Sequence, residues 1–269
     1  MKKPHLGLVF WLSAGFLVLL VLFAVVGPFF LPDYNKVVGP TNQFSLAGHI
    51  FGTDDQGRSI AARLAYGTRI SLFVGLLVQA IALVVGVIVG VTGVYAPRWI
   101  SVPLMRFTDG MFAFPDLLLA ILIVGIFGAS LNAVIVALSI TAWPAVARLV
   151  KTQVATLKDR EFLMASQALG AKTPYLVVKH ILPHLWGILL AVSMVELAAT
   201  ILAESSLSFL GIGVQAPMPS WGSMINSARL GINSHPEILL WPCLFLSATI
   251  FALNFVGDGL RALTDPKSR

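Results

Sequence analysis

Charged residues are scarce in this sequence. Asp, Glu, Lys and Arg together make up 11% of the 269 residues, against about 25% in an average soluble domain, and a water-exposed surface cannot be built from so few charges. Cysteine is nearly absent too: Cys243 is the only one, which excludes an internal disulfide and a thiolate metal site. Apolar residues reach 57%, which excludes intrinsic disorder. The composition therefore indicates an all-α integral membrane protein and argues against an ordinary soluble enzyme.

Six stretches are candidates for membrane-spanning helices, because about 20 mostly apolar helical residues cross the hydrocarbon core of a bilayer. The predicted spans are Leu6–Leu31, the uncharged interval between Arg69 and Arg98, Val102–Phe127, Ala133–Ala147, Leu182–Ala203 and Ile238–Gly257. Arg106, Asp109 and Asp116 interrupt the third. Gly86 and Gly90 lie four residues apart in the second, a spacing that lets two helix backbones approach closely.

The first span has two interpretations. Lys2 and Lys3 precede an apolar run, as they would in a secretory signal peptide. However, the apolar core of a signal peptide is only about 7–15 residues long and ends at a small-residue cleavage site. The run from Leu6 to Leu31 is longer and is followed by no such site. We therefore expect a retained membrane anchor.

The basic residues predict the orientation. With a cytoplasmic N-terminus, 13 of the 18 Lys and Arg residues fall in cytoplasmic segments, as the positive-inside rule requires. Both termini are then cytoplasmic, because the number of predicted spans is even. The longest cytoplasmic connection joins the fourth and fifth spans.

That connection is much longer than an antiparallel helix pair needs. Apolar residues on one helical face and charged residues on the other predict an amphipathic helix from Lys151 to Gly170. The glycine suits a helix C-cap. Thr173-Pro174 then predicts the start of a second short helix that continues to Pro183. Such a helix–glycine–helix unit is suited to docking a soluble partner. An interfacial helix pair lying on lipid headgroups is the alternative.

Within this unit, Ala165-Ser166-Gln167-Ala168-Leu169-Gly170 is followed by Ile181-Leu182-Pro183. The pattern resembles the "EAA" loop of bacterial ATP-binding-cassette (ABC) importer permeases, the coupling region that contacts the ATPase subunit. Met164 stands where that loop usually has Glu, and Glu161 lies one turn earlier. The resemblance implies ATPase-coupling roles for Glu161, Ala165, Ser166, Ala168, Leu169, Gly170, Ala171, Ile181 and Pro183.

Further blocks narrow the resemblance. They are residues 51–58 with 63–72, 105–115, 204–215 with 219–222, and 253–261 with 265–266. In this order they are similar to blocks of the dipeptide/oligopeptide/nickel permease family, and the chain is most like the "C" permease of dipeptide and oligopeptide systems. Ser59 departs from the family pattern, which usually has an acidic residue after Gly-Arg.

The resemblance implies a non-catalytic transport subunit in the bacterial inner membrane, embedded in lipid. An N-terminal helix and external loop would occupy residues 1–69, and the transmembrane core residues 70–269, with a coupling loop at about 151–183. Its implied partners are a second homologous permease, two cytoplasmic ATPases that hold ATP and Mg, and an external substrate-binding protein, with no nucleic acid. Di- or oligopeptides are the implied cargo, and nickel, a metal chelate or glutathione are alternatives.

Two other function classes remain. An ion-gradient-driven secondary transporter often shows internal repeats and charged midplane sites, but no convincing repeat is present here. An intramembrane enzyme needs a nucleophile–base or metal constellation, and no histidine lies in the interior of a predicted span to act as base, since His184 is only the third residue of the fifth. The chain also lacks a G-x-x-x-x-G-K-[ST] phosphate loop, so we do not expect it to bind ATP itself.

Three acidic residues are candidates for the substrate path. Asp116 and Glu196 fall inside predicted spans, where an ionised group is costly and usually faces a partner or an aqueous cavity. Glu204 follows at the outer end of the fifth span. Structural pairing is the alternative for Asp116 and Glu196, and a capping or packing role is the alternative for Glu204.

Other motifs indicate structure. His180 and His184 have a metal-ligand spacing on a helix, but Pro183 lies between them and no third ligand is near, so no metal site is predicted. Trp143-Pro144 predicts an interfacial anchor with a local kink.

Asp54-Asp55 and Arg58 lie in a segment bounded by Gly52 and Gly57. A substrate-attracting patch is one interpretation of these charges. The glycines favour a structured turn, in which we expect Arg58 to hold neighbouring backbone carbonyls.

Overall fold

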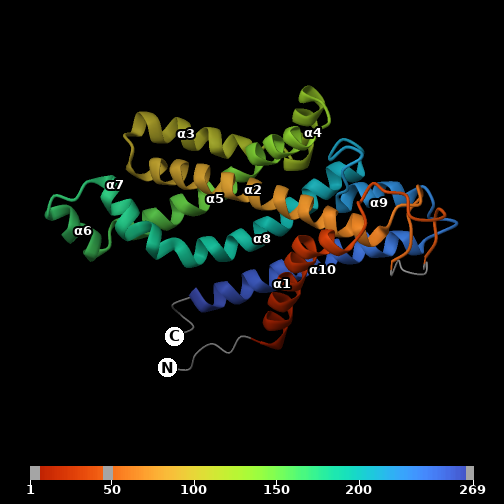
Figure 1. Cartoon of the computed structure of the whole chain (residues 1–269). Coiled ribbons are helices and arrows are strands. Elements are labelled where there is room, and N and C mark those ends of the chain that lie inside the picture. The colour runs from red at the N-terminus through yellow and green to blue at the C-terminus, as the bar shows by residue number, and fades with distance from the viewer. Residues whose placement is uncertain (1–6, 45–50, 265–269) are drawn as a thin grey trace.

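The computed structural model describes residues 7–44 and 51–264, and its regular structure in these ranges is helical (Figure 1). The helices are α1 (Leu8–Phe30), α2 (Ile60–Tyr95), α3 (Arg98–Met111), α4 (Asp116–Phe127), α5 (Leu131–Lys158), α6 (Glu161–Ala168), α7 (Thr173–Leu176), the π-helical turn η1 (Val177–Ile181), α8 (Leu182–Phe209), α9 (Trp221–Arg229) and α10 (Glu237–Thr264). The all-α prediction is confirmed. The predictions for Lys2, Lys3, Leu6, Asp265, Pro266, Lys267 and Arg269 fall outside the described residues.

Five helical segments in the described ranges are long and apolar enough to cross a membrane, and a sixth span results if α3 and α4 count as one bent pair. The five are Leu8–Phe30, Ile60–Tyr95, Leu131–Lys158, Thr173–Phe209 and Glu237–Leu263. The fourth of these joins α7, η1 and α8 into one continuous segment. The structure is therefore that of a polytopic membrane protein with five to six candidate spans.

The prediction of one continuous helix over Val102–Phe127 is wrong. α3 and α4 meet at a bend of 91°, and Figure 1 shows α4 turned away from the line of α3. α4 starts immediately after Pro115, which has no N–H to donate and which disfavours helical backbone in the residue before it. Asp109, one of the charges that interrupts the apolar run, pairs instead with Arg148 of α5 at 2.9 Å.

The predicted boundary between the fourth span and the amphipathic helix is also wrong, because α5 runs without a break to Lys158. The turn lies at Asp159-Arg160, so the predicted helix over 151–170 is divided between α5 and α6. A continuous buried face of α5, which includes Val150 and Val154, holds the helix against the apolar core past its membrane segment.

Trp143 and Pro144 lie inside α5, and neither ends the helix. The Trp143 side chain is only 9% exposed and stacks on Phe107 of α3, with ring centroids 6.2 Å apart. The expected interfacial anchor is therefore a helix-packing residue in this structure.

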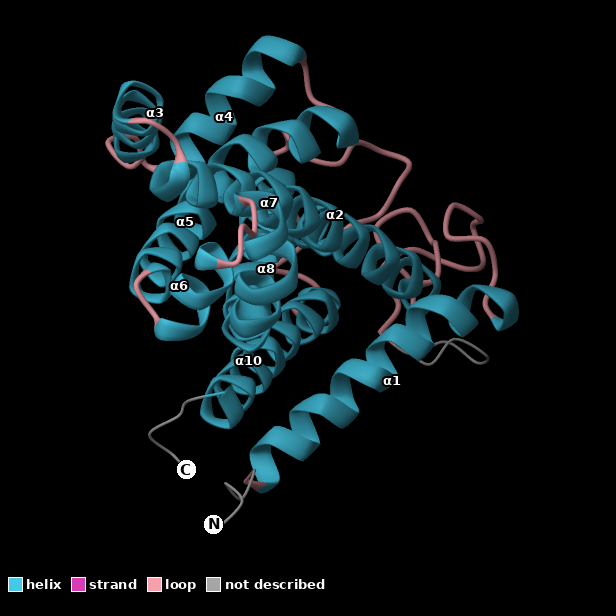
Figure 2. Ribbon diagram, turned by 90° about the vertical axis from the view of Figure 1, so that its left-hand side faces the viewer, coloured by secondary structure: helices cyan, strands magenta, loops and turns pink. Residues whose placement is uncertain are grey.

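Glycines let α2 pack closely on its neighbours. A Cβ atom added to Gly86 would lie 2.6 Å from Val146 of α5, and one added to Gly90 would meet α5 at 2.7 Å. On another face, a Cβ on Gly75 would lie 2.8 Å from Ile201 of α8. α2 is thus held between α5 and α8, which places it at the centre of the bundle (Figure 2).

The remaining long helices cover this centre. α8 packs on α10, and α1 contacts both α2 and α10. Phe10 near the start of α1 contacts Gly259 near the end of α10, which brings the two ends of the described chain together. α6 and α7 lie at one end of the bundle, whereas α9 and the loop before α2 lie at the opposite end (Figure 1).

Candidate functional site

The turn between α6 and α7 has a defined backbone geometry. α6 ends at Leu169, and Gly170 follows with φ +88°, a left-handed conformation that favours glycine. The Ala171 N–H donates to the Ser166 carbonyl at 3.1 Å, and the Gly170 N–H donates to the Gln167 carbonyl at 2.9 Å. These two hydrogen bonds form a Schellman motif, so the end of α6 is closed by its own backbone.

Buried apolar residues fasten this segment to the membrane helices. Leu163 of α6, Leu176 of α7 and Ile181 of η1 are almost fully buried. They belong to one apolar cluster with Leu157 at the end of α5 and Leu185 at the start of α8. The segment from α6 to η1, residues 161–181, is therefore packed as one unit between α5 and α8. We call it the coupling segment, after the role that the sequence resemblance implies for it.

The exposed residues of the coupling segment include large apolar side chains beside polar ones such as Gln167, Lys172 and Lys179. Leu169 at the turn is 90% exposed, and Met164, Tyr175 and Val178 are also exposed. Exposed apolar groups that gather on one surface mark an interaction site. Of the residues predicted to couple, Glu161, Ala165, Ala168, Leu169, Gly170 and Pro183 are exposed, Ser166 and Ala171 are half-buried, and Ile181 is buried.

The histidines beside this segment surround an aromatic ring. The Phe162 ring lies 6.3 Å from the rings of both His180 and His184, measured between centroids. No group of three or more His, Cys, Asp or Glu side chains suited to a metal ion occurs in the described part of the chain. Their ring contacts with Phe162 join α6 to η1 and to the start of α8.

Two of the three path candidates lie near each other. Asp116 is the first residue of α4 and is exposed, and Glu196 of α8 is half-buried. Their carboxylates are close enough to interact electrostatically. Within the described residues, neither has a basic side chain within ion-pair distance.

Glu204 lies elsewhere, in an enclosed cage of hydroxyl groups. Its side chain is fully buried. Its Oε2 accepts from the Ser71 hydroxyl of α2 at 3.1 Å, and its Oε1 accepts from Ser208 at 2.8 Å. Ser205 lies 3.4 Å from Oε2. Three hydroxyl donors therefore satisfy this carboxylate, and a structural role accounts for its contacts.

The cage continues into the backbone. The Ser208 Oγ accepts from the Val214 N–H at 3.0 Å, and the Ser71 Oγ lies 3.4 Å from the Trp221 N–H at the start of α9. Each hydroxyl thus accepts from an N–H and donates to Glu204. The network joins α2, α8 and the N-terminus of α9. The serines at 205 and 208, one and four residues after Glu204, were the available sequence signal.

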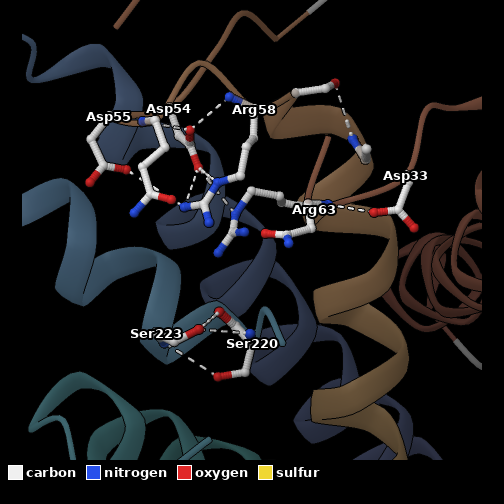
Figure 3. A network of polar contacts seen from close by, with 11 residues as sticks. Asp33, Asp54, Asp55, Arg58, Arg63, Ser220 and Ser223 are labelled. Atoms are coloured by element: carbon white, nitrogen blue, oxygen red, sulfur yellow. Dashed lines mark hydrogen bonds and ion pairs between the residues drawn. The ribbon is translucent and has the colours of Figure 1, made fainter. Parts of the chain in front are cut away.

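A second polar network lies at the same end of the bundle (Figure 3). The Asp54 Oδ2 is 2.7 Å from both Nε and Nη2 of Arg58, and 3.3 Å from Nε of Arg63. The Asp54 Oδ1 accepts from the backbone N–H groups of Gln56 and Arg58 at 2.9 Å each. The predicted structured turn is present, but Arg58 binds a carboxylate and not backbone carbonyls.

The sequence analysis assigned no role to Arg63. It lies in the first turn of α2, four residues after the N-cap Ser59, and its side chain reaches Asp54 across the turn. A basic residue one helical turn after a helix start beside an Asp-rich loop was the only signal for this contact.

Comparison with known proteins agrees with this architecture. Residues 82–269 match the family model described as "Binding-protein-dependent transport system inner membrane component". The dipeptide transport system permease protein DppC of Bacillus subtilis (strain 168) is 41% identical over 274 residues, which cover 100% of this chain and 84% of that protein. The oligopeptide transport system permease protein OppC of the same strain is 39% identical, with 94% of this chain and 84% of that protein covered.

Two more distant similarities are also to transport proteins. The glutathione transport system permease protein GsiD of Pectobacterium atrosepticum is 35% identical, with 95% of this chain and 86% of that protein covered. A chain of an inward-facing structure of the MetNI methionine ABC transporter superposes with a TM-score of 0.63 at 21% identity, with coverage of 76% of this chain and 97% of that one. This last likeness concerns the fold.

The family model and the full-length relatives agree with the helical membrane architecture described above. The chain belongs to the family of binding-protein-dependent transport system inner membrane components and is a multi-pass, non-catalytic permease component of an ABC importer.

Proposed function

We propose that this chain forms half of the translocation pathway of an ATP-driven importer of di- or oligopeptides. The two permeases with the highest identities quoted above carry dipeptides and oligopeptides by name. Glutathione is a second candidate cargo, because the GsiD protein is similar at a somewhat lower identity. Nickel and metal chelates remain the further alternatives from the sequence resemblance.

The coupling segment carries the proposal of ATP-driven transport. Its buried residues tie it to α5 and α8, while Leu169, Tyr175 and Val178 leave large apolar side chains exposed. An apolar surface outside the lipid needs a protein to cover it. A cytoplasmic ATPase bound there would move residues 151–183 as a unit, and α5 and α8 would tilt with it.

Two states of this pathway, outward- and inward-facing, must be close in free energy for ATP binding and substrate delivery to switch between them. In this scheme the partners are a second, homologous permease, two ATPases that hold ATP and Mg, and an external substrate-binding protein. The resembling loop usually has a Glu at the position of Met164. Glu161, exposed at the start of α6, would provide the acidic contact to the ATPase instead.

The proposed orientation puts the coupling segment and both termini in the cytoplasm of a bacterial cell, with residues 1–69 forming an anchor helix and an external loop and residues 70–269 the core. The excess of basic residues in these segments supports this arrangement. The contact between Phe10 and Gly259 supports a common side for both ends. Asp116 and Glu196 are the proposed path residues, and Glu204 is assigned to packing.

Replacing Gly170 tests the coupling. Gly170→Val should uncouple ATP hydrolysis from uptake, because a β-branched residue at φ +88° is strained by about 1–2 kcal/mol or more, and relief of that strain opens the turn. An added Cβ itself meets no atom within 4 Å, so the effect comes from the backbone. Uptake per ATP hydrolysed, measured in liposomes, should fall severalfold.

Gly170→Asn is the matched control, since Asn tolerates the left-handed conformation. It should retain most of the uptake, and both variants should insert into the membrane normally. Wild-type coupling in Gly170→Val would refute the coupling role of this segment.

A further inference from the structure

A cavity lies at the end of the bundle opposite the coupling segment. Its volume is about 250 Å³, and it is enclosed by the loop before α2, the first turn of α2, α9 and the start of α10. Since a water molecule occupies about 30 Å³ of liquid, this space holds a group the size of one amino-acid residue. Under the proposed orientation the cavity belongs to the external face.

A buried guanidinium with unused donor capacity lines the cavity. Arg63 is 5% exposed, and its Nη1 has no hydrogen-bond partner among the described residues. Figure 3 shows its terminal nitrogens on the side of the guanidinium away from Asp54. A buried donor without a partner is costly, and a charged one more so.

The acidic residues nearby do not supply the missing acceptor. The Asp54 carboxylate already accepts from Arg58, from Arg63 Nε and from two backbone N–H groups. Asp55 is half-exposed and lies 3.8 Å from Arg58. At the far wall, His235 Nδ1 is 3.2 Å from Glu237. One buried carboxylate therefore serves two buried guanidiniums, and Arg63 Nη1 is left without an acceptor among the described residues.

The rest of the lining suits an amphipathic residue. Ile60, Met224 and Ile238 are buried and make an apolar floor. Asn42 and Ser227 add polar groups to the lining. An apolar floor with a few convergent polar groups is the usual composition of a small-molecule site.

We propose that this cavity binds the C-terminal residue of a short peptide, with the carboxylate on Arg63 and the side chain on the floor formed by Ile60, Met224 and Ile238. A guanidinium binds a planar carboxylate through two parallel hydrogen bonds. The inference rests on the proposed function for the identity of the ligand. The same carboxylate chemistry is available from an acidic side chain of a docked external binding protein, so the experiment separates the two sources.

The first arm measures binding of L-leucyl-L-leucine and of its C-terminal amide by calorimetry, with the assembled importer in nanodiscs and no binding protein present. The free acid should bind wild type at least about tenfold more tightly than the amide. Arg63→Gln should weaken binding of the acid by at least about tenfold. Ala228→Leu, which adds apolar volume to the cavity lining and replaces no member of the Asp54 ion network, should weaken it as well.

Arg229→Gln is the matched control. It also removes one positive charge, from the last turn of α9, but Arg229 is exposed and stacks on Phe209, outside the cavity. This variant should bind the dipeptide like wild type. Because Ala228→Leu leaves the ion network intact, a folding defect in Arg63→Gln would not make the test uninformative.

The second arm measures docking of the peptide-free binding protein to the same nanodiscs. If the dipeptide does not bind but docking is weakened by Arg63→Gln and Ala228→Leu, and not by Arg229→Gln, then the carboxylate site stands and its occupant is the binding protein. If neither dipeptide binding nor docking differs between the cavity variants and the control, the carboxylate site is refuted. ATP-dependent uptake by the wild-type importer reports the proposed function separately.

Discussion

At the scale of single residues, Glu204 shows how a carboxyl group is kept inside an apolar bundle by hydroxyl groups, with no basic partner among the described residues. The hydroxyl groups of Ser71, Ser205 and Ser208 surround its two oxygens at 2.8–3.4 Å. Backbone N–H groups that donate to Ser71 and Ser208 align these hydroxyls toward the carboxylate. A buried acid with both carboxylate oxygens hydrogen-bonded is a structural element, and its removal leaves its partners without an acceptor.

Glu204→Ala should therefore destabilise the permease by about 1–3 kcal/mol, the usual cost of leaving buried polar groups without partners. The thermal unfolding midpoint of the purified complex in detergent measures this. Ser206→Ala is the control, because the exposed Ser206 hydroxyl bonds only to its own helix, at the Leu202 carbonyl. Equal midpoints for Glu204→Ala and Ser206→Ala would show that the cage adds no net stability.

At the scale of helices, the contact between α2 and α5 depends on glycines facing branched side chains. A Cβ atom at residue 86 would lie only 2.6 Å from Val146. The backbones of α2 and α5 therefore approach as closely as glycine permits. This contact positions the membrane part of α5, and the same helix runs to Lys158, just before the coupling segment, against which it packs. Loosening it should therefore affect stability and transport together.

Gly86→Ala should lower the stability of the bundle by about 1–3 kcal/mol, because an added methyl group forces α2 and α5 apart. Thermal unfolding combined with ATP-dependent uptake in liposomes measures both effects. Gly125→Ala is the matched control: Gly125 is also helical, in α4, but an added Cβ there meets nothing within 4 Å. A Gly86→Ala protein as stable as Gly125→Ala would contradict the close packing.

At the scale of the whole molecule, the two ends of the bundle differ in character. One end carries the coupling segment with the exposed Leu169, and the other carries the two polar networks, the cavity and the exposed Leu230. These ends must lie on opposite sides of the membrane if the long helices cross it. The proposed orientation assigns the first to the cytoplasm.

Thiol labelling tests this assignment. In a Cys243→Ala background, a membrane-impermeant maleimide added to intact spheroplasts should label Leu230→Cys and not Leu169→Cys. After permeabilisation, both should react, because both side chains are more than four-fifths exposed. The opposite pattern would invert the topology, and labelling of both in intact spheroplasts would contradict a transmembrane arrangement.

The features that the sequence predicts are local, whereas the features that only the structure reveals are contacts between residues far apart in the chain. The amino-acid sequence by itself determined the helical membrane character and the glycine turn at residue 170, because length, hydropathy and backbone preference act within a few neighbouring residues. Only the tertiary structure decided that α5 continues to Lys158 and that Arg63 shares Asp54 with Arg58. It also decided that Glu204 meets Ser71, 133 residues away in the chain. Such contacts depend on which helices lie side by side, and no local pattern specifies that.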